Sequence, residues 1–324
     1  MDTLKTINLT SFANFSSVNS TLELIRAVFW SEYQSRFTAW YTLTILLCFL
    51  LGFFNVLCVL VIYKTRALRT GAGALMAHMI FIESITCLIT LPVWLTLTFI
   101  HLTTTLTCRI FQFFFAVVNI AVYFNILILA INRFVAIIFP LSYRQFTQPR
   151  WIKTFISLIW MISVVVNIPM EFVGGVGHFG IDRVWGGCAA NLIRPGQPDY
   201  RSLHIILAMY SPLALTGVLY LIILLKARTK THHTDVSPAE PSGDTAREAR
   251  VYRRKMNMSY LLFFSFLAYC VLFLSFPLVT RSIPKAVVQF PMIVLWMVVV
   301  FTFGHAVHSV SKLKPYCMNI ITTN

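Results

Sequence analysis

Long apolar runs separated by short polar segments dominate the chain. Seven of these runs have about the 20 residues that a helix needs to cross roughly 30 Å of hydrocarbon. Each run is too long and too uniformly apolar for a membrane-spanning strand, whose residues alternate over about ten positions. The pattern predicts an all-α membrane protein, a seven-transmembrane helix bundle with spans at 40–63, 72–100, 108–139, 152–170, 203–228, 253–280 and 287–310.

Composition and charge add an orientation to this bundle. Hydrophobic residues make up 58% of the 324 residues and charged residues 11%, with a mean hydropathy of +0.76. So much apolar surface cannot be hidden in an ordinary soluble core. Most of the 26 Lys and Arg residues fall in short loops on one side of the spans, and that side is predicted to be cytoplasmic. We therefore expect the N-terminus outside and the C-terminus in the cytoplasm.

The predicted topology divides the chain into three parts. Residues 1–39 form an extracellular tail, residues 40–311 the seven-transmembrane domain with a flexible inner loop at 229–250, and residues 312–324 a short cytoplasmic tail. Asn-x-Ser/Thr sites in the outer tail are predicted to be glycosylated. These sites are Asn8, Asn14 and Asn19.

The net charge of +15 at pH 7 fits a basic cytoplasmic rim that faces anionic membrane lipid. The chain has neither a zinc-spaced Cys and His set nor an alternation of aromatic and basic residues. The sequence therefore indicates no metal site, no cofactor and no nucleic-acid partner. Because no nucleophile and base occur together in the apolar runs, we do not expect an enzyme.

Two cysteines lie outside the apolar interior. Cys108 is at the outer start of the third span, and Cys188 is in the longest outer loop, residues 171–202. An oxidising exterior favours a disulfide between them, which would hold the loop over the bundle. The loop is rich in glycine, which suits tight turns or a short hairpin.

Prolines inside the apolar runs should kink or loosen their helices, because proline has no N–H for the helical ladder. They are Pro92, Pro169, Pro212 and Pro277.

The third apolar run ends in Ala130-Ile-Asn132-Arg133-Phe134, and Pro140-Leu-Ser-Tyr143 follows. An arginine in such a run is costly and marks a functional candidate. Residues 40–316 resemble the class A, rhodopsin-like G-protein-coupled receptors. The resemblance rests on this motif and on residues at matching positions of the other spans. The other matching features are Gly52 with Asn55, Glu83 with Pro92, Cys108 placed 25 residues before Arg133, Trp160, Pro212 with Tyr220, and Pro277.

The resemblance implies a multi-pass receptor of the plasma membrane. An extracellular ligand would favour a bundle with the sixth helix swung out, and the opened inner crevice would bind a heterotrimeric G protein. Arg133 would then bridge toward Tyr220 and the G protein, near Tyr143 of the second inner loop. His308 would have to replace the tyrosine that the family has in the seventh helix.

The sequence departs from the family at the partners of this arginine. Asn132 replaces the acid that normally precedes the arginine, and Asn257 lies where some members have an acid at the base of the sixth helix. A neutral amide can hydrogen-bond the guanidinium but supplies no compensating charge. Raised basal activity is therefore one hypothesis.

Further departures concern the sixth and seventh helices. The sixth lacks the usual Trp before its proline, and the seventh has Gly304-His305-Ala-Val-His308 in place of Asn-Pro-x-x-Tyr. Asn55, Glu83, Gly304 and His305 are the expected buried polar core. Either Glu83 pairs with His305 and makes activation pH-dependent, or it is protonated and hydrogen-bonded to neighbours.

The ligand pocket implied by the resemblance lies between the outer ends of the third, fifth, sixth and seventh helices. Phe115 lies where amine receptors have an aspartate, so we do not expect a monoamine ligand. The lining is apolar and aromatic with a few neutral polar groups, which suits a lipid-like, weakly polar or peptide ligand. The lining residues are Gln112, Phe115, Ala116, Asn119, His204, Ala208, Leu278, Ser282 and Met297.

Two other classes of function remain open. The missing motifs of the sixth and seventh helices allow a non-signalling seven-helix protein, a decoy or scavenging receptor. A transporter or channel fits less well, because no inverted repeat is visible and only Glu83 and the histidines are polar groups in the spans that suit it. Cys317, after the last span, is a candidate for palmitoylation.

Overall fold

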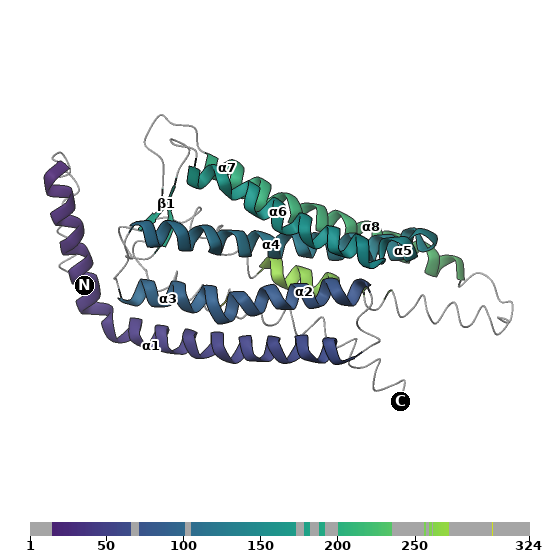
Figure 1. Ribbon diagram of the computed structural model, residues 1–324, viewed down its shortest axis with the longest axis horizontal. Coiled ribbons are helices and arrows are strands. Elements are labelled where there is room, and N and C mark those ends of the chain that lie inside the picture. Colours follow the sequence, from purple (N-terminus) through teal and green to yellow (C-terminus); the bar gives the residue numbers. More distant parts are fainter. Residues whose placement is uncertain are drawn as a thin grey trace.

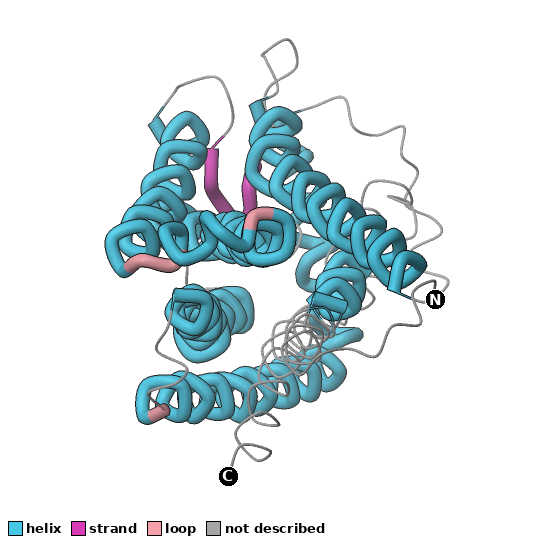
Figure 2. The backbone as a smooth tube through the Cα atoms, turned by 90° about the vertical axis from the view of Figure 1, so that its right-hand side faces the viewer, coloured by secondary structure: helices cyan, strands magenta, loops and turns pink. Residues whose placement is uncertain are grey.

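The computed structural model describes residues 15–65, 71–100, 105–172, 178–181, 188–191, 200–234, 256, 259–260, 262–271 and 300. Long helices lie side by side along the longest axis of the molecule, and the first part of α1 turns away from that axis (Figure 1). Viewed from one end, the helices surround a common interior (Figure 2). The fold is that of a helical membrane bundle.

The helices follow one another in the order that the apolar runs predict. They are α1 (Phe15–Lys64), α2 (Gly71–Ile85) with η3 (Thr86–Thr90) and α3 (Leu91–Ile100), α4 (Thr105–Ile138), α5 (Pro140–Phe146), α6 (Pro149–Phe172), and α7 (Tyr200–Ile205) with η4 (Ile206–Tyr210) and α8 (Ser211–Thr234).

Among the described residues, five helices are long and apolar enough to cross a membrane, and the shorter apolar helix Leu262–Val271 lies in the predicted sixth span. The five crossing segments are Gln34–Lys64, Gly73–Ile100, Leu106–Ile138, Pro149–Met170 and Leu203–Lys226. The spans predicted for these regions are confirmed to within a few residues.

Two helices extend into segments predicted to be irregular. α1 begins at Phe15, inside the predicted tail, and α8 continues to Thr234, inside the predicted inner loop. Hydropathy marks only the part of a helix that lies in the hydrocarbon, so a helix that continues into water is missed. The outer loop contains the expected hairpin, in which β1 (His178–Ile181) pairs antiparallel with β2 (Cys188–Asn191).

Two of the predicted proline sites coincide with π-helical turns. η3 ends just before Leu91 and Pro92, and η4 ends just before Ser211 and Pro212. The Leu91 N–H donates to the Thr86 carbonyl and the Ser211 N–H to the Ile206 carbonyl, five residues back in each case. Proline would clash with the carbonyl four residues before it, and a wider turn removes that clash. Pro169, in contrast, lies within the α-helix α6.

The core is built around α4. This helix contacts α2, α6, α8 and both strands of the hairpin. Buried apolar side chains of α4, including Ala121, Ile126 and Leu129, belong to one cluster with residues of α2, α6, α8 and the Leu262–Val271 helix. Large apolar side chains such as Leu46 and Phe53 on α1 are exposed, as expected of a surface that faces lipid.

Glycine permits the close approach of α1 to η3. A Cβ atom at Gly52 would collide with the Leu88 side chain and lie 3.3 Å from the Cβ of Cys87. At Gly217 on α8, a Cβ would meet only the Phe266 ring, at an ordinary 3.8 Å. The first contact therefore requires glycine, and the second tolerates alanine.

We predict that Gly52→Ala destabilises the protein and that Gly217→Ala does not. Both changes gain the same helix propensity, but only the first overpacks an interface, at a cost of about 1–3 kcal/mol. Thermal unfolding of the purified variants in detergent compares them directly. Equal melting temperatures for the two variants would contradict the close packing of α1 on η3.

Candidate functional site

Arg133 lies near the inner end of α4, and only 8% of its surface is exposed. Its guanidinium interacts electrostatically with the Tyr220 hydroxyl on α8. Tyr220 is buried between the rings of Phe263 and Phe266, with centroid distances of 5.9 and 5.8 Å. The structure thus brings together Arg133 and Tyr220 as expected, and it places the sixth-span helix beside them.

Asn132, next to the arginine, is 1% exposed. Neither the nitrogen nor the oxygen of its amide has a hydrogen-bond partner within the described part of the chain. The expected bond from this amide to the Arg133 guanidinium is therefore not made. A buried polar group without a partner costs about 1–3 kcal/mol, so this conformation is penalised at Asn132.

The short helix α5 follows the arginine and carries Tyr143. Pro140 opens this helix at a position where proline is favoured, since the first helical N–H groups need no partner. Gly71, at the start of α2, lies against Thr147, and a Cβ at Gly71 would be only 2.7 Å from the Thr147 carbonyl oxygen. Leu141 on α5 is 95% exposed.

A hydrogen-bonded chain joins three helices, and sequence reasoning missed it. The Trp160 indole N–H on α6 donates to Nε2 of His78 on α2, at 3.1 Å. Nδ1 of the same histidine lies 3.2 Å from Oδ1 of Asn125 on α4. Indole is only a donor, so His78 Nε2 accepts and Nδ1–H donates to Asn125. These two hydrogen bonds require a neutral His78 imidazole with its proton on Nδ1.

Glu83 and Asn55 are both fully buried in the bundle, as predicted for the polar core. Glu83 interacts electrostatically with Tyr269 of the sixth-span helix. The Tyr269 ring contacts that of Tyr123 on α4 at 6.3 Å, edge to face. The two tyrosines extend the polar core toward α4, and no motif in the sequence marked them.

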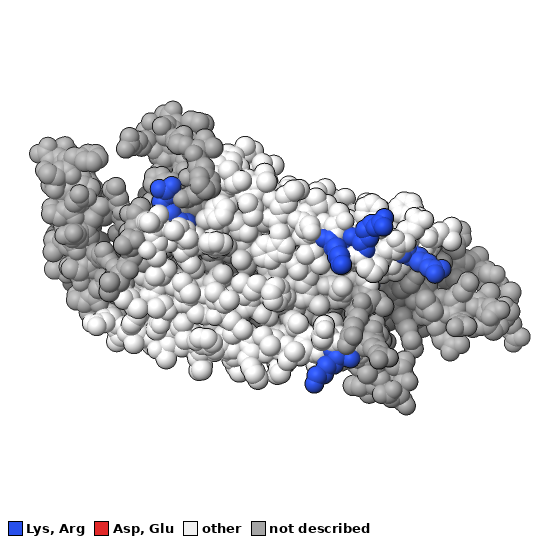
Figure 3. All heavy atoms as spheres, viewed as in Figure 1, with Lys and Arg blue, Asp and Glu red and all other residues white. Residues whose placement is uncertain are grey.

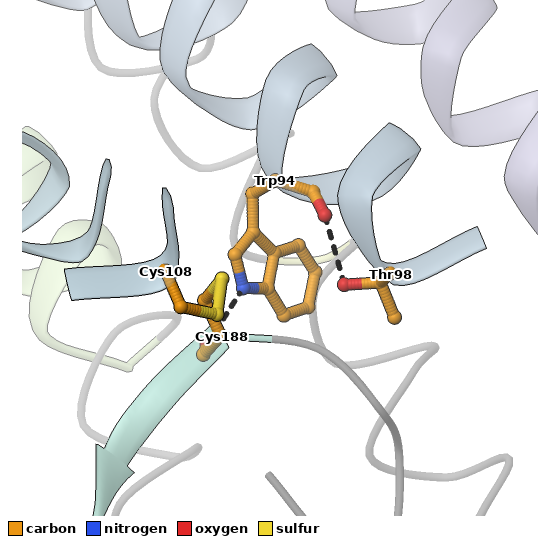
Figure 4. Close-up of a disulfide and its surroundings, with 4 residues drawn as sticks. All are labelled: Trp94, Thr98, Cys108 and Cys188. Atoms are coloured by element: carbon orange, nitrogen blue, oxygen red, sulfur yellow. Dashed lines mark hydrogen bonds between the residues drawn. A yellow bond between two sulfur atoms is a disulfide. The ribbon is translucent and has the colours of Figure 1, made fainter. Parts of the chain in front are cut away.

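The predicted disulfide is present at the outer end. The sulfurs of Cys108 on α4 and Cys188 on β2 are 1.94 Å apart, and the Cα atoms are 5.2 Å apart. The indole N–H of Trp94 on α3 donates to the Cys188 carbonyl at 3.2 Å (Figure 4). The hairpin is therefore attached to α4 by a covalent bond and to α3 by a hydrogen bond.

The polar residues of the predicted ligand pocket bind mostly to the protein itself. The Asn119 amide donates to the Phe115 carbonyl at 2.7 Å, and Nε2 of His204 lies 3.0 Å from Oδ1 of Asn167 on α6. Oε1 of Gln112 is buried and has no partner among the described residues.

The one aromatic and two alanine positions of the predicted pocket are partly or fully buried. Phe115 packs on the cluster formed by Phe37, Trp40 and Leu95 at the outer ends of α1 and α3. Ala116 is half-buried on α4, and Ala208 is buried on η4. Gln112 is thus the polar candidate most available to a ligand.

Several residues of the predicted sites lie outside the described residues. They are Asn8, Asn14, Asn257, Pro277, Leu278, Ser282, Met297, Gly304, His305, His308 and Cys317. Asn19 lies in the helical backbone of α1, in the part whose side chains are not described.

The family model described as "7 transmembrane receptor (rhodopsin family)" matches residues 54–310, most of the chain. The chain belongs to this receptor family. It is a multi-pass protein of the plasma membrane, and its family consists of receptors rather than enzymes.

Individual relatives of the receptor are distant. Mouse (Mus musculus) "G-protein coupled receptor 52" is 25% identical over 215 residues, which cover 61% of this chain and 57% of that protein. Human (Homo sapiens) "Probable G-protein coupled receptor 21" is 28% identical over 181 residues, 52% of this chain and 50% of that protein. The receptor thus spans about half the length of the curated relatives it matches.

Squid rhodopsin, a solved structure, superposes on the receptor with a TM-score of 0.70 at 15% identity. The match covers 86% of this chain and 81% of that chain. This likeness confirms the predicted seven-transmembrane fold.

We predict that the hydrogen bond between His78 and Trp160 stabilises the receptor, so that the two side chains are energetically coupled. In a double-mutant cycle with His78→Phe and Trp160→Phe, the coupling energy should be about 1 kcal/mol. SDS-induced unfolding of the purified variants measures it. His78→Phe combined with Trp94→Phe is the control and should be additive, since Trp94 bonds to Cys188 instead. Additivity in both cycles would contradict the three-helix chain.

Proposed function

We propose that this receptor transmits an extracellular ligand signal to a heterotrimeric G protein and that it signals partly without ligand. The observation that carries the proposal is the inner end of α4. Arg133 is buried beside Tyr220, while the neighbouring Asn132 amide supplies neither a charge nor, within the described chain, a hydrogen bond. The names of the relatives, which are G-protein coupled receptors, support the partner.

Tyr220, which interacts electrostatically with Arg133, offers a hydroxyl rather than a carboxylate. A neutral partner holds a guanidinium less strongly than a carboxylate does, because it supplies no opposite charge. The aromatic contacts of Tyr220 with Phe263 and Phe266 also join the sixth-span helix to this site. Movement of that helix would therefore release Tyr220 and Arg133 together.

The exposed side of α5 is the proposed docking surface next to this crevice. Leu141 extends almost entirely out of the protein, and Phe139 beside it is also exposed. Thr147, packed on Gly71, fixes where α5 lies relative to α2. An apolar side chain presented on a fixed helix suits a hydrophobic pocket on a protein partner.

An outer ligand acts in this proposal by population shift, binding one arrangement of the bundle more tightly than the other. Gln112 offers an acceptor oxygen, and Phe115 offers an aromatic face. Phe115 lies where amine receptors have an aspartate, so the proposed ligand is a neutral or weakly polar molecule rather than a monoamine.

We predict G-protein activation by the wild-type receptor in the absence of added ligand. Arg133→Ala should abolish this activation, because the guanidinium contacts the partner. Asn132→Asp should lower it several-fold, since an acid beside Arg133 stabilises the resting arrangement by about 1–3 kcal/mol. A G-protein dissociation panel in cells measures all three proteins at matched surface expression.

Outcomes of the same panel separate the alternatives. Gly217→Ala, which changes only an ordinary contact, is the control and should equal the wild type. Activity equal to that of cells without receptor, for the wild type and for both variants, would favour a non-signalling receptor. Activity that survives Arg133→Ala would contradict the role given to the arginine.

A further inference from the structure

Three buried side chains that can donate hydrogen bonds lie near the C-terminal end of α4 and beside it. Asn132 is 1% exposed, Arg133 8%, and Tyr220 on α8 3%. Neither atom of the Asn132 amide has a hydrogen-bond partner within the described chain. Buried polar groups in folded proteins are almost always hydrogen-bonded, to the protein or to a small bound species. The Asn132 amide therefore marks a place where such a species can bind.

The geometry of α4 places Arg133 beside Tyr220. Ala130, Arg133 and Ile137 are three and four residues apart and so share one side of the helix. Ala130 and Ile137 belong to the same buried cluster as Tyr220, and the Arg133 guanidinium interacts electrostatically with the Tyr220 hydroxyl. Asn132 is the adjacent residue, with its Cα about 3.8 Å from that of Arg133. Because a guanidinium has five N–H donors, it can contact Tyr220 and an acceptor near Asn132 together.

The charge at this site differs from that of the receptors the chain resembles. Asn132 replaces an acid, so one negative charge is missing next to a buried arginine. Glu83, the acid whose side chain is described, interacts instead with Tyr269. The Tyr269 ring contacts Tyr123, which precedes Arg133 by ten residues, or about 15 Å along α4. Glu83 therefore supplies no negative charge beside Asn132.

We propose that a small monovalent anion, chloride, binds at Asn132 beside Arg133 and Tyr220. The ion would accept hydrogen bonds from the amide nitrogen, the guanidinium and the tyrosine hydroxyl, all of which are donors. A paired anion stabilises a buried cation, because charges removed from water are tolerated only with a partner and hydrogen bonds. A monatomic ion suits the site, since each side chain is more than nine-tenths buried and a larger anion would need more donors.

Exposed cations lie close to this end of α4. The short helix α5 begins two residues after α4 ends, and it carries Arg144, while α6 carries Arg150. Both side chains are exposed. Blue side chains lie around α5 in Figure 3, and no red atoms appear on that face of the described chain. Surface charge of one sign raises the local concentration of counter-ions, so chloride is enriched next to the proposed site.

The ion would stabilise the resting arrangement, and this consequence rests on the proposed function. Arg133 contacts the G protein in the proposed active arrangement and then leaves the ion. Chloride and G protein therefore weaken each other's binding, as linkage requires. An exchanging ion is bound only part of the time, so it restrains Arg133 less than an acid at position 132 would. Chloride would thus lower basal activation without abolishing it.

The test measures chloride binding to the full-length receptor in nanodiscs of phosphatidylcholine. Chloride-35 magnetic resonance reports bound chloride as a broadening of the signal beyond that of empty nanodiscs. Gluconate, a large anion, keeps the ionic strength at about 0.15 M while chloride is varied. Asn132→Asp places a carboxylate where the ion would bind. Gln145→Glu is the matched control, because it adds the same charge at an exposed position of α5.

We expect excess broadening with the wild type and with Gln145→Glu, and loss of most of it with Asn132→Asp. Asn132→Leu removes the amide donor without adding charge and should also lose it, so the test remains decisive if Asn132→Asp does not fold. Absence of excess broadening with the wild type would overturn the proposal. Equal broadening by the wild type and the Asn132 variants would overturn it too, as would an equal loss in Gln145→Glu.

Thermal unfolding provides a second measurement of the same site. Replacing gluconate by chloride should raise the melting temperature of the wild type and of Gln145→Glu by about 3 °C, because a ligand that binds only the folded state stabilises it. Asn132→Asp should show no such rise, since its own carboxylate occupies the site. The same rise in all three proteins would assign the effect to chloride in general and contradict the site.

Signalling is tested separately, by nucleotide exchange on a purified G protein without added ligand. Basal exchange by the wild type should be several-fold higher in gluconate than in chloride, and Asn132→Asp should show equal exchange in the two anions. Equal exchange by an active wild type in both anions would refute the regulatory step. Chloride binding is measured without G protein, so it is decided even if the receptor does not signal.

Discussion

Helix α4 contacts α2, α6, α8 and the β1–β2 hairpin, so the position of nearly every described element depends on its packing. In an apolar bundle the polar side chains of such a central helix must find partners inside the protein, because lipid offers none. Oδ1 of Asn125 does so through His78, but Nδ2 of Asn125 and Oε1 of Gln112 have no partner within the described chain. Asn132 does not do so within the described chain. Asn125 lies in the middle of α4, and Asn132 lies near its C-terminal end, which is predicted to face the cytoplasm.

The spans could be predicted from the sequence because the thickness of the bilayer imposes their length. Their local geometry could not. Pro92 and Pro212 indicated distortions, but not that both would be π turns, which depends on how the freed carbonyls find new donors. A single histidine in an apolar run, such as His78, forms no recognisable motif. Its role depends on a hydrogen bond from Trp160, which is 82 residues away. Asn119 and His204 were predicted to face a ligand, whereas each bonds within the protein.

The inner end combines a buried charge, a neutral neighbour and the exposed short helix that is proposed as a docking surface. The penalty at Asn132, about 1–3 kcal/mol, is comparable with the energies by which two arrangements of a receptor differ. In the proposed function, a bundle with such a small difference populates both arrangements, and a ligand then needs only a modest preference to change the balance. The proposed basal signalling follows from this small difference.

The most direct test of this scheme is the distance between the inner ends of α6 and the sixth-span helix in the receptor without ligand. Spin labels introduced as unnatural amino acids at Lys153 and Tyr260, both exposed, report it by double electron–electron resonance. The account predicts two populated distances in the wild type and a shift toward the shorter one in Asn132→Asp. A single short distance in the wild type, unchanged in Asn132→Asp, would contradict it.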